Sequence, residues 1–218
     1  MEQISKKKKI LPFYTVGEEI FNAVSHGAGA LFGIAGAVLL LIRAARCSNS
    51  LGIVAAAIYS LTLILLYTMS TLYHALTGKR AKYVFRVFDH CTIFLLIAGT
   101  YTPMMLVLLG NLQGWIICLL LWAITALCVT LNAVDLERYR VFSMVCYVCM
   151  GWCALIVFLP VVRALGLWGS VLLLTGGIAY TAGLLFFRSK ARYMHAIWHL
   201  FVLAGSILHY FCILFFVY

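Results

Sequence analysis

Long apolar runs alternate with short polar connections along almost the whole chain. A helix that crosses a membrane needs roughly 20 mostly apolar residues, and seven runs reach that length. They cover residues 20–42, 51–73, 84–109, 115–134, 141–162, 165–187 and 194–217. The connections between them are too short to fold as separate domains. The pattern therefore predicts an all-α integral membrane protein built as a bundle of seven transmembrane helices.

Composition supports this class and excludes a soluble one. The chain has 218 residues, of which 65% are hydrophobic and 10% are charged, whereas soluble domains are nearer half apolar and a quarter charged. The formal net charge of +10 raises the question of nucleic-acid binding. The basic residues sit in short clusters between apolar runs, and this spacing is typical of residues that orient membrane helices. We therefore expect no nucleic-acid partner.

Basic residues are distributed unequally between the two predicted sides of the membrane. One side collects thirteen Lys and Arg, and the other has only three, Arg43, Arg46 and Arg163. Because cytoplasmic loops carry the excess of Lys and Arg, this count predicts a cytoplasmic N-terminus and, after seven crossings, an external C-terminus. The basic side comprises Lys6–Lys9, Lys79, Arg80, Lys82, Arg86, Arg138, Arg140, Arg188, Lys190 and Arg192.

Two segments follow from this division. We expect residues 1–14 to form a basic cytoplasmic tail and residues 15–218 to form the seven-helix transmembrane domain. Gly29 and Gly33 form a small-xxx-small pair in the first run, a spacing that brings membrane helices close together. We favour packing within one chain at this pair over the alternative, an interface of a homo-oligomer.

The polar residues inside the runs gather at one depth. Ionisable groups are expensive inside a bilayer, so each is a candidate functional residue. With alternating helix directions, five of the six histidines and one aspartate fall near the cytoplasmic ends of four runs, while His209 lies ten residues beyond His199. The residues at the cytoplasmic depth are Glu19, Asn22, Ser25, His26, Ser70, His74, Asp89, His90, His195 and His199.

Helical spacing turns part of this set into a candidate metal site. His195 and His199 are four residues apart and therefore stack on one helix face. Two such histidines with a third from another helix, His74, supply a three-ligand zinc site that keeps a fourth position for water. Asp89 is the nearby carboxylate that would offset the metal charge. Two alternatives stay open: hydrogen-bonded packing histidines, and a proton or ion path without metal.

Several short motifs, taken in order, resemble the bacterial hemolysin III proteins of the progestin and adipoQ receptor family, which includes the adiponectin receptors. The resemblance covers the chain from about Thr15 to its C-terminus. The motifs are Glu19-Ile-Phe-Asn22-Ala-Val-Ser25-His26, Ser70-Thr-Leu-Tyr-His74, Phe85-Arg-Val-Phe88-Asp89-His90, Ala98-Gly99-Thr100-Tyr101-Thr102-Pro103, His195-Ala-Ile-Trp-His199 and Phe201-Val-Leu-Ala-Gly205-Ser206-Ile-Leu-His209-Tyr210.

The resemblance implies a seven-helix fold, a multi-pass location in the bacterial plasma membrane and a zinc ion near the cytoplasmic face. It assigns His74, His195 and His199 as the metal ligands, with Asp89 near the water and Ser70 beside it. It also implies ceramidase-like hydrolysis, with membrane lipid or a lipid-like small molecule as partner. The chain departs from the receptors at His90, where they carry an aromatic residue.

Three functions are consistent with these residues. The first is a zinc-dependent hydrolase of a lipid-like amide or ester, with Asp89 as the general base and Ser70 as a hydrogen-bond donor. Around them, the chain offers a layer of polar residues that orients the site or relays protons. The second is a lipid receptor or sensor with a structural zinc, and the third is a pore-forming hemolysin. The polar layer comprises Glu19, Asn22, Ser25, His26, His90 and His209.

Overall fold

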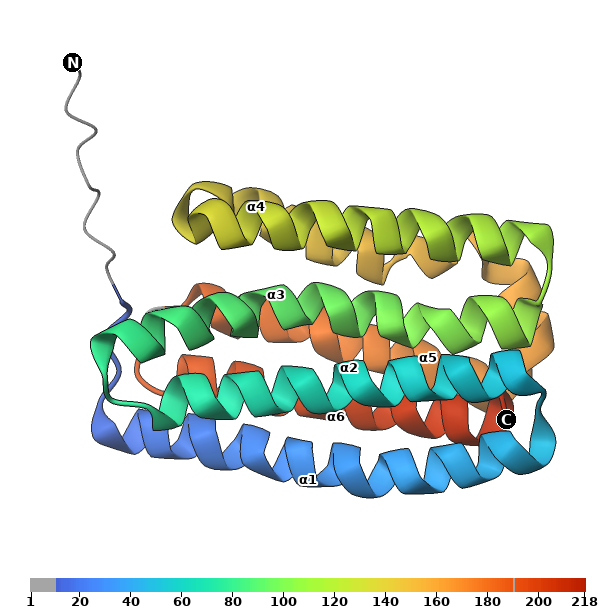
Figure 1. Ribbon diagram of the computed structural model, residues 1–218, viewed down its shortest axis with the longest axis horizontal. Helices are drawn as coiled ribbons and strands as arrows, with labels where there is room; N and C mark the ends of the chain where they lie inside the picture. The colour runs from blue at the N-terminus through green and yellow to red at the C-terminus, as the bar shows by residue number, and fades with distance from the viewer. Residues whose placement is uncertain (1–10, 190) are drawn as a thin grey trace, which may run out of the picture.

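The computed structural model describes residues 11–189 and 191–218, and this part of the chain is helical with no strand. The basic residues Lys6–Lys9 and Lys190 lie outside the described residues. The elements follow one another as α1 (Val16–Cys47), α2 (Ser50–Ala75), α3 (Lys79–Pro103), η1 (Met104–Leu109), α4 (Leu112–Gly151), η2 (Cys153–Val157), α5 (Phe158–Arg188) and α6 (Met194–Phe216). Figure 1 shows them as one elongated bundle.

Five helical stretches in the described residues are long and apolar enough to cross a membrane. The first three predicted runs and the last each correspond to one of them. The fourth, fifth and sixth runs all fall within a single stretch of 77 residues, Leu112–Arg188. The all-helical membrane class is confirmed, whereas seven separate spans are not distinguished by length and composition alone.

The long stretch contains two breaks in helical geometry. Asp135 has φ −155° and ψ 91° within α4, and Gly166 has φ 66° and ψ −170° within α5. A straight helix of the 40 residues of α4 would be about 60 Å long, roughly twice the hydrocarbon thickness. Figure 1 instead shows α4 turning back on itself at the end that carries the first described residues.

Local sequence signals explain where several helices begin. Thr15 caps α1 and forms a capping box with Glu18, so two of the orphan N–H groups of the first turn are satisfied. Asn49 and Asn111 cap α2 and α4 by accepting hydrogen bonds from Gly52 N at 3.1 Å and Gly114 N at 2.8 Å. The Thr15 cap fixes the start of α1, the part of that helix that carries Glu19, Asn22, Ser25 and His26.

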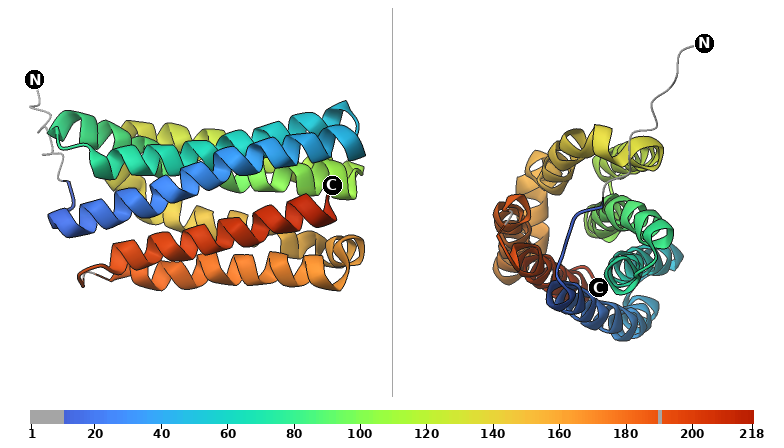
Figure 2. Two further views of the ribbon diagram at one scale, coloured as in Figure 1. Left: turned by 90° about the horizontal axis from the view of Figure 1, so that it is seen from below. Right: turned by 90° about the vertical axis from the view of Figure 1, so that its left-hand side faces the viewer.

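The helices pack as a ring, with α1 against α2 and α6, α2 against α3, α3 against α4, and α5 against α6. Figure 2 (right) shows this ring along the length of the bundle. Gly29 lies directly against the Tyr67 ring of α2, where a Cβ would clash. The close packing predicted for Gly29 and Gly33 is therefore confirmed between α1 and α2 of one chain.

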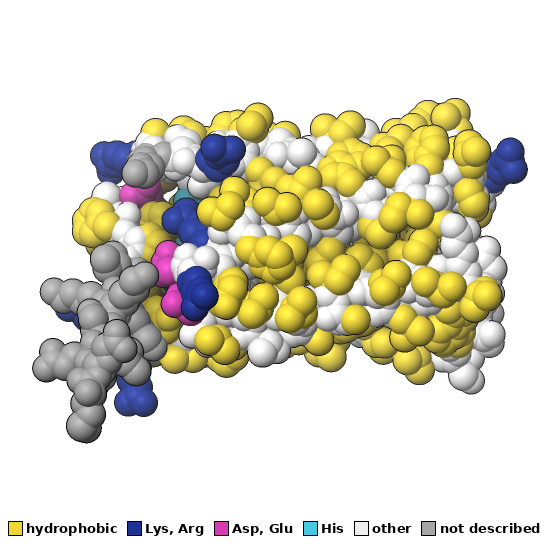
Figure 3. Space-filling view, turned by 90° about the horizontal axis from the view of Figure 1, so that it is seen from above, with side chains coloured by type: hydrophobic (Ala, Val, Ile, Leu, Met, Phe, Trp, Pro, Cys, Tyr) yellow, Lys and Arg dark blue, Asp and Glu magenta, His cyan; other side chains and the backbone are white. Residues whose placement is uncertain are grey.

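The outer surface is mostly apolar, and charged side chains gather at one end (Figure 3). The first described residues lie at that end, and the C-terminus lies near the other (Figure 1). Arg86 of α3 and Glu137 of α4 pair there at 2.6 Å. The charged end is also the end at which α2 finishes and α6 begins, so it holds the predicted polar cluster.

Candidate metal centre

Three histidines from two helices meet at the charged end of the bundle. His74 ends α2, and His195 and His199 occupy the first two turns of α6. One ligand atom of each lies within 4.8 Å of the others. The ring centroids are separated by 5.2 Å between His74 and His195, 5.1 Å between His74 and His199, and 4.7 Å between His195 and His199. The predicted triad is therefore brought together as a candidate metal site, the histidine cluster.

The donor atoms of the histidine cluster fit a zinc ion. The Nε2 atoms of His74, His195 and His199 are all buried and have no hydrogen-bond partner among the described residues. A buried polar atom without a partner costs roughly 1–3 kcal/mol, and three such nitrogens on neighbouring rings suit the binding of a metal ion. Three imidazole nitrogens are a common donor set for zinc that retains an open fourth position.

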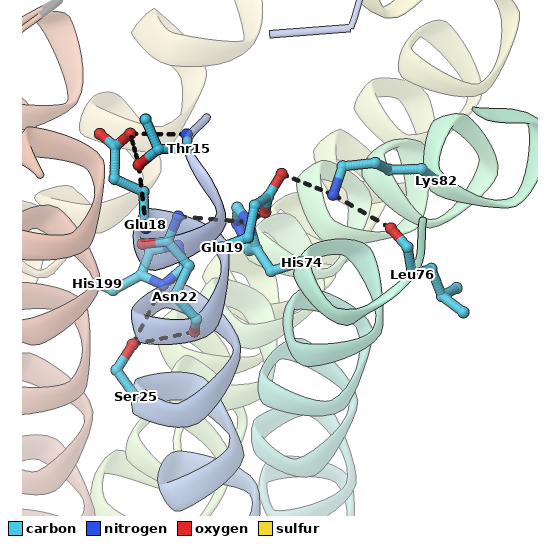
Figure 4. Close-up of polar contacts among 9 residues, drawn as sticks. All are labelled: Thr15, Glu18, Glu19, Asn22, Ser25, His74, Leu76, Lys82 and His199. Atoms are coloured by element: carbon cyan, nitrogen blue, oxygen red, sulfur yellow. Dashed lines mark hydrogen bonds and ion pairs between the residues drawn. The ribbon is translucent and has the colours of Figure 1, made fainter. Parts of the chain in front are cut away.

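The opposite ring nitrogens are held by residues of α1 (Figure 4). His74 Nδ1 lies 2.7 Å from Glu19 Oε2, and because a carboxylate only accepts, the nitrogen is the donor. This bond fixes the tautomer whose Nε2 carries the lone pair, as is usual for histidines that ligate metals. His199 Nδ1 lies 3.5 Å from Ser25 Oγ. Asn22 Nδ2 lies 3.4 Å from His74 Nδ1, but because both nitrogens are donors in this arrangement, the pair is a contact and not a hydrogen bond.

A lysine completes the chain of contacts behind His74. Lys82 Nζ pairs with Glu19 Oε1 at 2.7 Å and donates to Leu76 O at 3.3 Å. Lys82 therefore pairs with the same carboxylate that accepts the hydrogen bond from His74. Sequence reasoning counted Lys82 only among the residues that orient the chain in the membrane. The signal available was its position eight residues after His74, but nothing in the sequence pairs it with α1.

Asp89 and Ser70 lie beside the histidine cluster. Asp89 on α3 is 4% exposed and close enough to His74 for their charges to interact. Ser70 on α2 is fully buried, and its hydroxyl lies beside the Asp89 carboxyl. A buried hydroxyl and a buried carboxyl side by side can together hold a water molecule or a polar group of a substrate.

The remaining predicted residues take two different positions. His26 stacks on His199, with ring centroids 3.6 Å apart, and neither of its ring nitrogens has a partner. His90 follows Asp89 in α3, and both residues line a cavity inside the bundle that is described below. His209 is separate: its Nε2 bonds the carbonyl of Leu173 at 3.0 Å, about 15 Å along α6 from His199 at the helical rise.

Tyr14 is a residue that sequence reasoning missed. Its ring centroid lies 5.0 Å from that of His195 and 5.7 Å from that of His74. Burial, with a smaller contribution from the Glu19 carboxylate, raises the pKa of the Tyr14 phenol above its ordinary value, so the hydroxyl remains neutral. Tyr14 precedes the first apolar run, and we see no sequence signal that places it over histidines of α2 and α6.

A largely apolar cavity of about 140 Å³ lies inside the bundle, and its lining includes His26 and Asp89, which lie next to the histidine cluster. His26, Asp89 and His90 lie at the polar end, and His209 lines the wall further along. The apolar wall comes from α3, α4, α5 and α6, among them Ile93, Ile97, Met144, Tyr147, Leu184 and Val202. Such a cavity suits an aliphatic chain whose polar group reaches the Asp89 end.

Comparisons with known proteins cover nearly the whole chain. A family model described as "Haemolysin-III related" matches residues 14–210. The chain is 39% identical over 203 residues to "Hemolysin-3" of Bacillus cereus, covering 93% of each chain. It is 38% identical over 204 residues to "Hemolysin-3 homolog" of Bacillus subtilis (strain 168), covering 93% of this chain and 96% of the relative.

A more distant similarity extends to animals. The chain is 29% identical over 210 residues to the human "Monocyte to macrophage differentiation factor", covering 91% of this chain and 84% of the relative. The region matched by the family model includes His74, His195 and His199. The similarity therefore concerns the helical bundle and its polar end together.

Proposed function

The chain belongs to the haemolysin-III related family, and we propose that it is a zinc-dependent intramembrane hydrolase of a lipid-like amide or ester. The observation that carries this proposal is the orphaned Nε2 triad of the histidine cluster beside Asp89. The apolar cavity that starts at Asp89 supports a lipid-like substrate rather than a water-soluble one. A multi-pass membrane protein of this family provides the setting for such a reaction.

His74, His195 and His199 would hold the zinc, with Glu19 behind His74. When bound, the ion supplies a Lewis acid that polarises a carbonyl group and makes water more acidic. Asp89 accepts the proton of the attacking water on its carboxylate. Ser70 Oγ donates a hydrogen bond to the oxygen that gains charge. As the carbon–nitrogen or carbon–oxygen bond breaks, Asp89 returns the proton to the leaving nitrogen or oxygen.

We also propose seven membrane crossings with a cytoplasmic N-terminus, in the plasma membrane of a bacterium. The breaks at Asp135 and Gly166 divide the 77-residue stretch near the connections expected between the fourth, fifth and sixth runs. The basic residues Arg138, Arg140 and Arg188 are on the side that the Lys and Arg count assigns to the cytoplasm. Similarity to two Bacillus proteins supports the bacterial setting.

Metal analysis of the purified protein tests the metal site. We expect about one zinc per chain in the wild type, as one three-histidine site implies, and its loss in the triple variant His74→Ala, His195→Ala, His199→Ala. The variant's helical content, measured by circular dichroism, serves as the folding control. A well-folded wild type without metal would overturn the zinc assignment and leave the histidines as a polar or proton-carrying cluster.

Hydrolysis is tested separately with Asp89→Asn. Because Asn keeps the size of the side chain but cannot take up a proton, we expect it to retain zinc and to lose at least about a hundredfold in turnover of a lipid amide or ester. Full turnover by this variant would contradict the role of Asp89. Retained zinc with no hydrolysis by the wild type would instead favour a receptor or sensor with structural metal.

Membrane lysis is a second candidate because the two bacterial relatives carry the name hemolysin. A pore would release dye from liposomes whether or not the histidine cluster is intact. Leakage that is unchanged by His199→Ala would therefore favour the pore over the hydrolase. Leakage that disappears with His199→Ala would tie it to the metal site.

A further inference from the structure

The segment before α1 covers the histidine cluster. Residues 11–15, the N-terminal strap, cross the charged end of the bundle between helices that are far apart in sequence (Figure 2, right). Tyr14 contacts His195 and His74 through its ring, whereas the neighbouring Phe13 is 90% exposed. The strap therefore turns one aromatic ring toward the site and leaves the adjacent, more apolar ring outside.

Glu18 fastens the strap to the start of α6. Its Oε2 accepts hydrogen bonds from Thr15 N at 2.9 Å and from Thr15 Oγ1 at 2.7 Å, and its Oε1 accepts one from Tyr193 N at 2.8 Å. Tyr193 has φ 60°, an uncommon conformation for a residue with a side chain. One buried carboxylate thus ties the strap to the turn that immediately precedes His195.

The unpartnered nitrogens lie beneath this cover. His195 is partly exposed as a residue, yet its Nε2 is buried, like those of His74 and His199. Asp89 and His26, which lie next to the cluster, line the apolar cavity, whose wall also includes Ile93, Tyr147 and Leu184. A charged solute cannot cross that apolar wall cheaply, so its direct route to the nitrogens is past Tyr14.

We propose that Tyr14 closes the histidine cluster at the charged end, so that metal and polar solutes exchange there only when the strap moves. A lipid-like substrate then enters through the apolar cavity between the helices. The inference rests on the proposed function for its metal and its substrate, but the cover itself is a property of the described residues. Closing the site against bulk water also strengthens every electrostatic interaction inside it.

Metal exchange measures the cover directly. The detergent-purified protein is mixed with an excess of a zinc-binding dye, and zinc loss is followed by the absorbance of the zinc–dye complex for wild type, Tyr14→Ala, Tyr14→Phe and Phe13→Ala. We expect zinc loss about tenfold faster in Tyr14→Ala, because the two ring contacts are removed. Tyr14→Phe keeps the ring and Phe13→Ala alters an exposed side chain of the same strap, so both should match the wild type.

Histidine labelling provides a readout that needs no metal. Metal-free protein is treated with diethyl pyrocarbonate, and modification of His195 is quantified by peptide mass spectrometry. We expect faster labelling in Tyr14→Ala and in Glu18→Gln, because Gln replaces one acceptor oxygen by a donor and loses at least one bond of the fastening. Glu18→Gln also serves as the second variant if Tyr14→Ala does not fold.

The outcomes separate the two proposals. Absence of zinc from the wild type would overturn the proposed function, and the labelling rates would still decide whether Tyr14 covers the site. Zinc loss and His195 labelling that are unchanged in Tyr14→Ala would overturn the cover while leaving the metal site intact. Equal acceleration in Phe13→Ala would also overturn it, because the effect would then reflect general loosening of the segment.

Discussion

His199 and His209 lie ten residues apart on α6, and only one of them has a hydrogen-bond partner for its Nε2 atom. His209 is satisfied: its Nε2 bonds Leu173 O at 3.0 Å, and its ring lies 5.4 Å from Tyr180 in a space that Gly176 leaves open. His199 is not, because its Nε2 has no partner and two more orphaned Nε2 atoms lie nearby.

The difference shows why the partner of each nitrogen matters more than the residue type. A histidine whose ring nitrogen reaches a helix carbonyl has met its hydrogen-bonding needs within the protein. Three neighbouring histidines that each leave Nε2 without a partner have not, and Glu19 holds the other ring nitrogen of one of them, His74. The first arrangement joins α6 to α5, and the second is arranged for a ligand.

The largest expected effect on zinc affinity comes from replacing His199, and the same replacement of His209 tests the comparison. His199→Ala removes one of three ligands, so we expect zinc affinity to fall by more than about a hundredfold, beyond the loss typical of residues behind a ligand. His209→Ala should keep the full zinc content and lose only some thermal stability, because it leaves a void and removes the hydrogen bond to Leu173 O. Competition with a zinc-binding dye measures the affinities.

Thermal unfolding of both variants without metal supplies the control. If His209→Ala lost zinc as completely as His199→Ala, the two histidines would belong to one coupled network, and the distinction drawn from their partners would be wrong. If His199→Ala kept zinc at wild-type affinity, the ligand assignment would fail at that residue.

The same comparison shows what sequence reasoning could reach. The apolar runs predicted the helices, and the four-residue spacing of His195 and His199 placed both on one face. The sequence placed His209 deeper along the helix but still assigned it to the polar layer around the site, whereas the structure bonds it to Leu173 O away from the cluster. The correct predictions rest on short-range periodicity, which the backbone geometry of a helix preserves in any tertiary context.

Contacts between distant segments were beyond that reasoning. Tyr14 meets His195, and Glu18 meets Tyr193, across nearly the whole length of the chain. No helical period links such residues. Glu18 also has a local partner, because it forms the capping box with Thr15 at the start of α1, and this local role gives no indication of its contact with Tyr193. Asp135 presents a related difficulty, because its non-helical backbone lies within a continuous run of helix and marks the turn only once the fold is known.

A smaller effect is expected behind His74. Glu19→Gln weakens the hydrogen bond to His74 Nδ1 and removes the ion pair with Lys82. We expect zinc affinity to fall about 10–100-fold, the usual range for a partner that orients a metal ligand. Lys82→Met leaves the Glu19–His74 bond in place and should change the affinity less. Competition with the same zinc-binding dye gives the affinities of the wild type, Glu19→Gln and Lys82→Met.

The decisive observation is which of the two variants, Glu19→Gln or Lys82→Met, loses more zinc affinity. A Glu19→Gln protein with wild-type affinity would mean that His74 is held in position by its packing, for example by the Tyr73 ring whose centroid lies 4.4 Å away. A larger loss in Lys82→Met than in Glu19→Gln would shift the orienting role from the carboxylate to the lysine charge.

The smallest expected effect is at Ser25. Its Oγ lies 3.5 Å from His199 Nδ1, at the long limit of a hydrogen bond, and it also donates to Asn22 O at 3.0 Å. Ser25→Ala removes this weak contact, so we expect only a few-fold loss of zinc affinity, below the loss in Glu19→Gln. Thr130→Ala is the matched control, because Thr130 also bonds a carbonyl of its own helix but is exposed and far along the chain from the site. If Ser25→Ala lowered zinc affinity as much as Glu19→Gln does, His199 would depend on its α1 partner as strongly as His74 does. The short contact between Glu19 and His74 would then be no more important for metal binding than the long contact between Ser25 and His199.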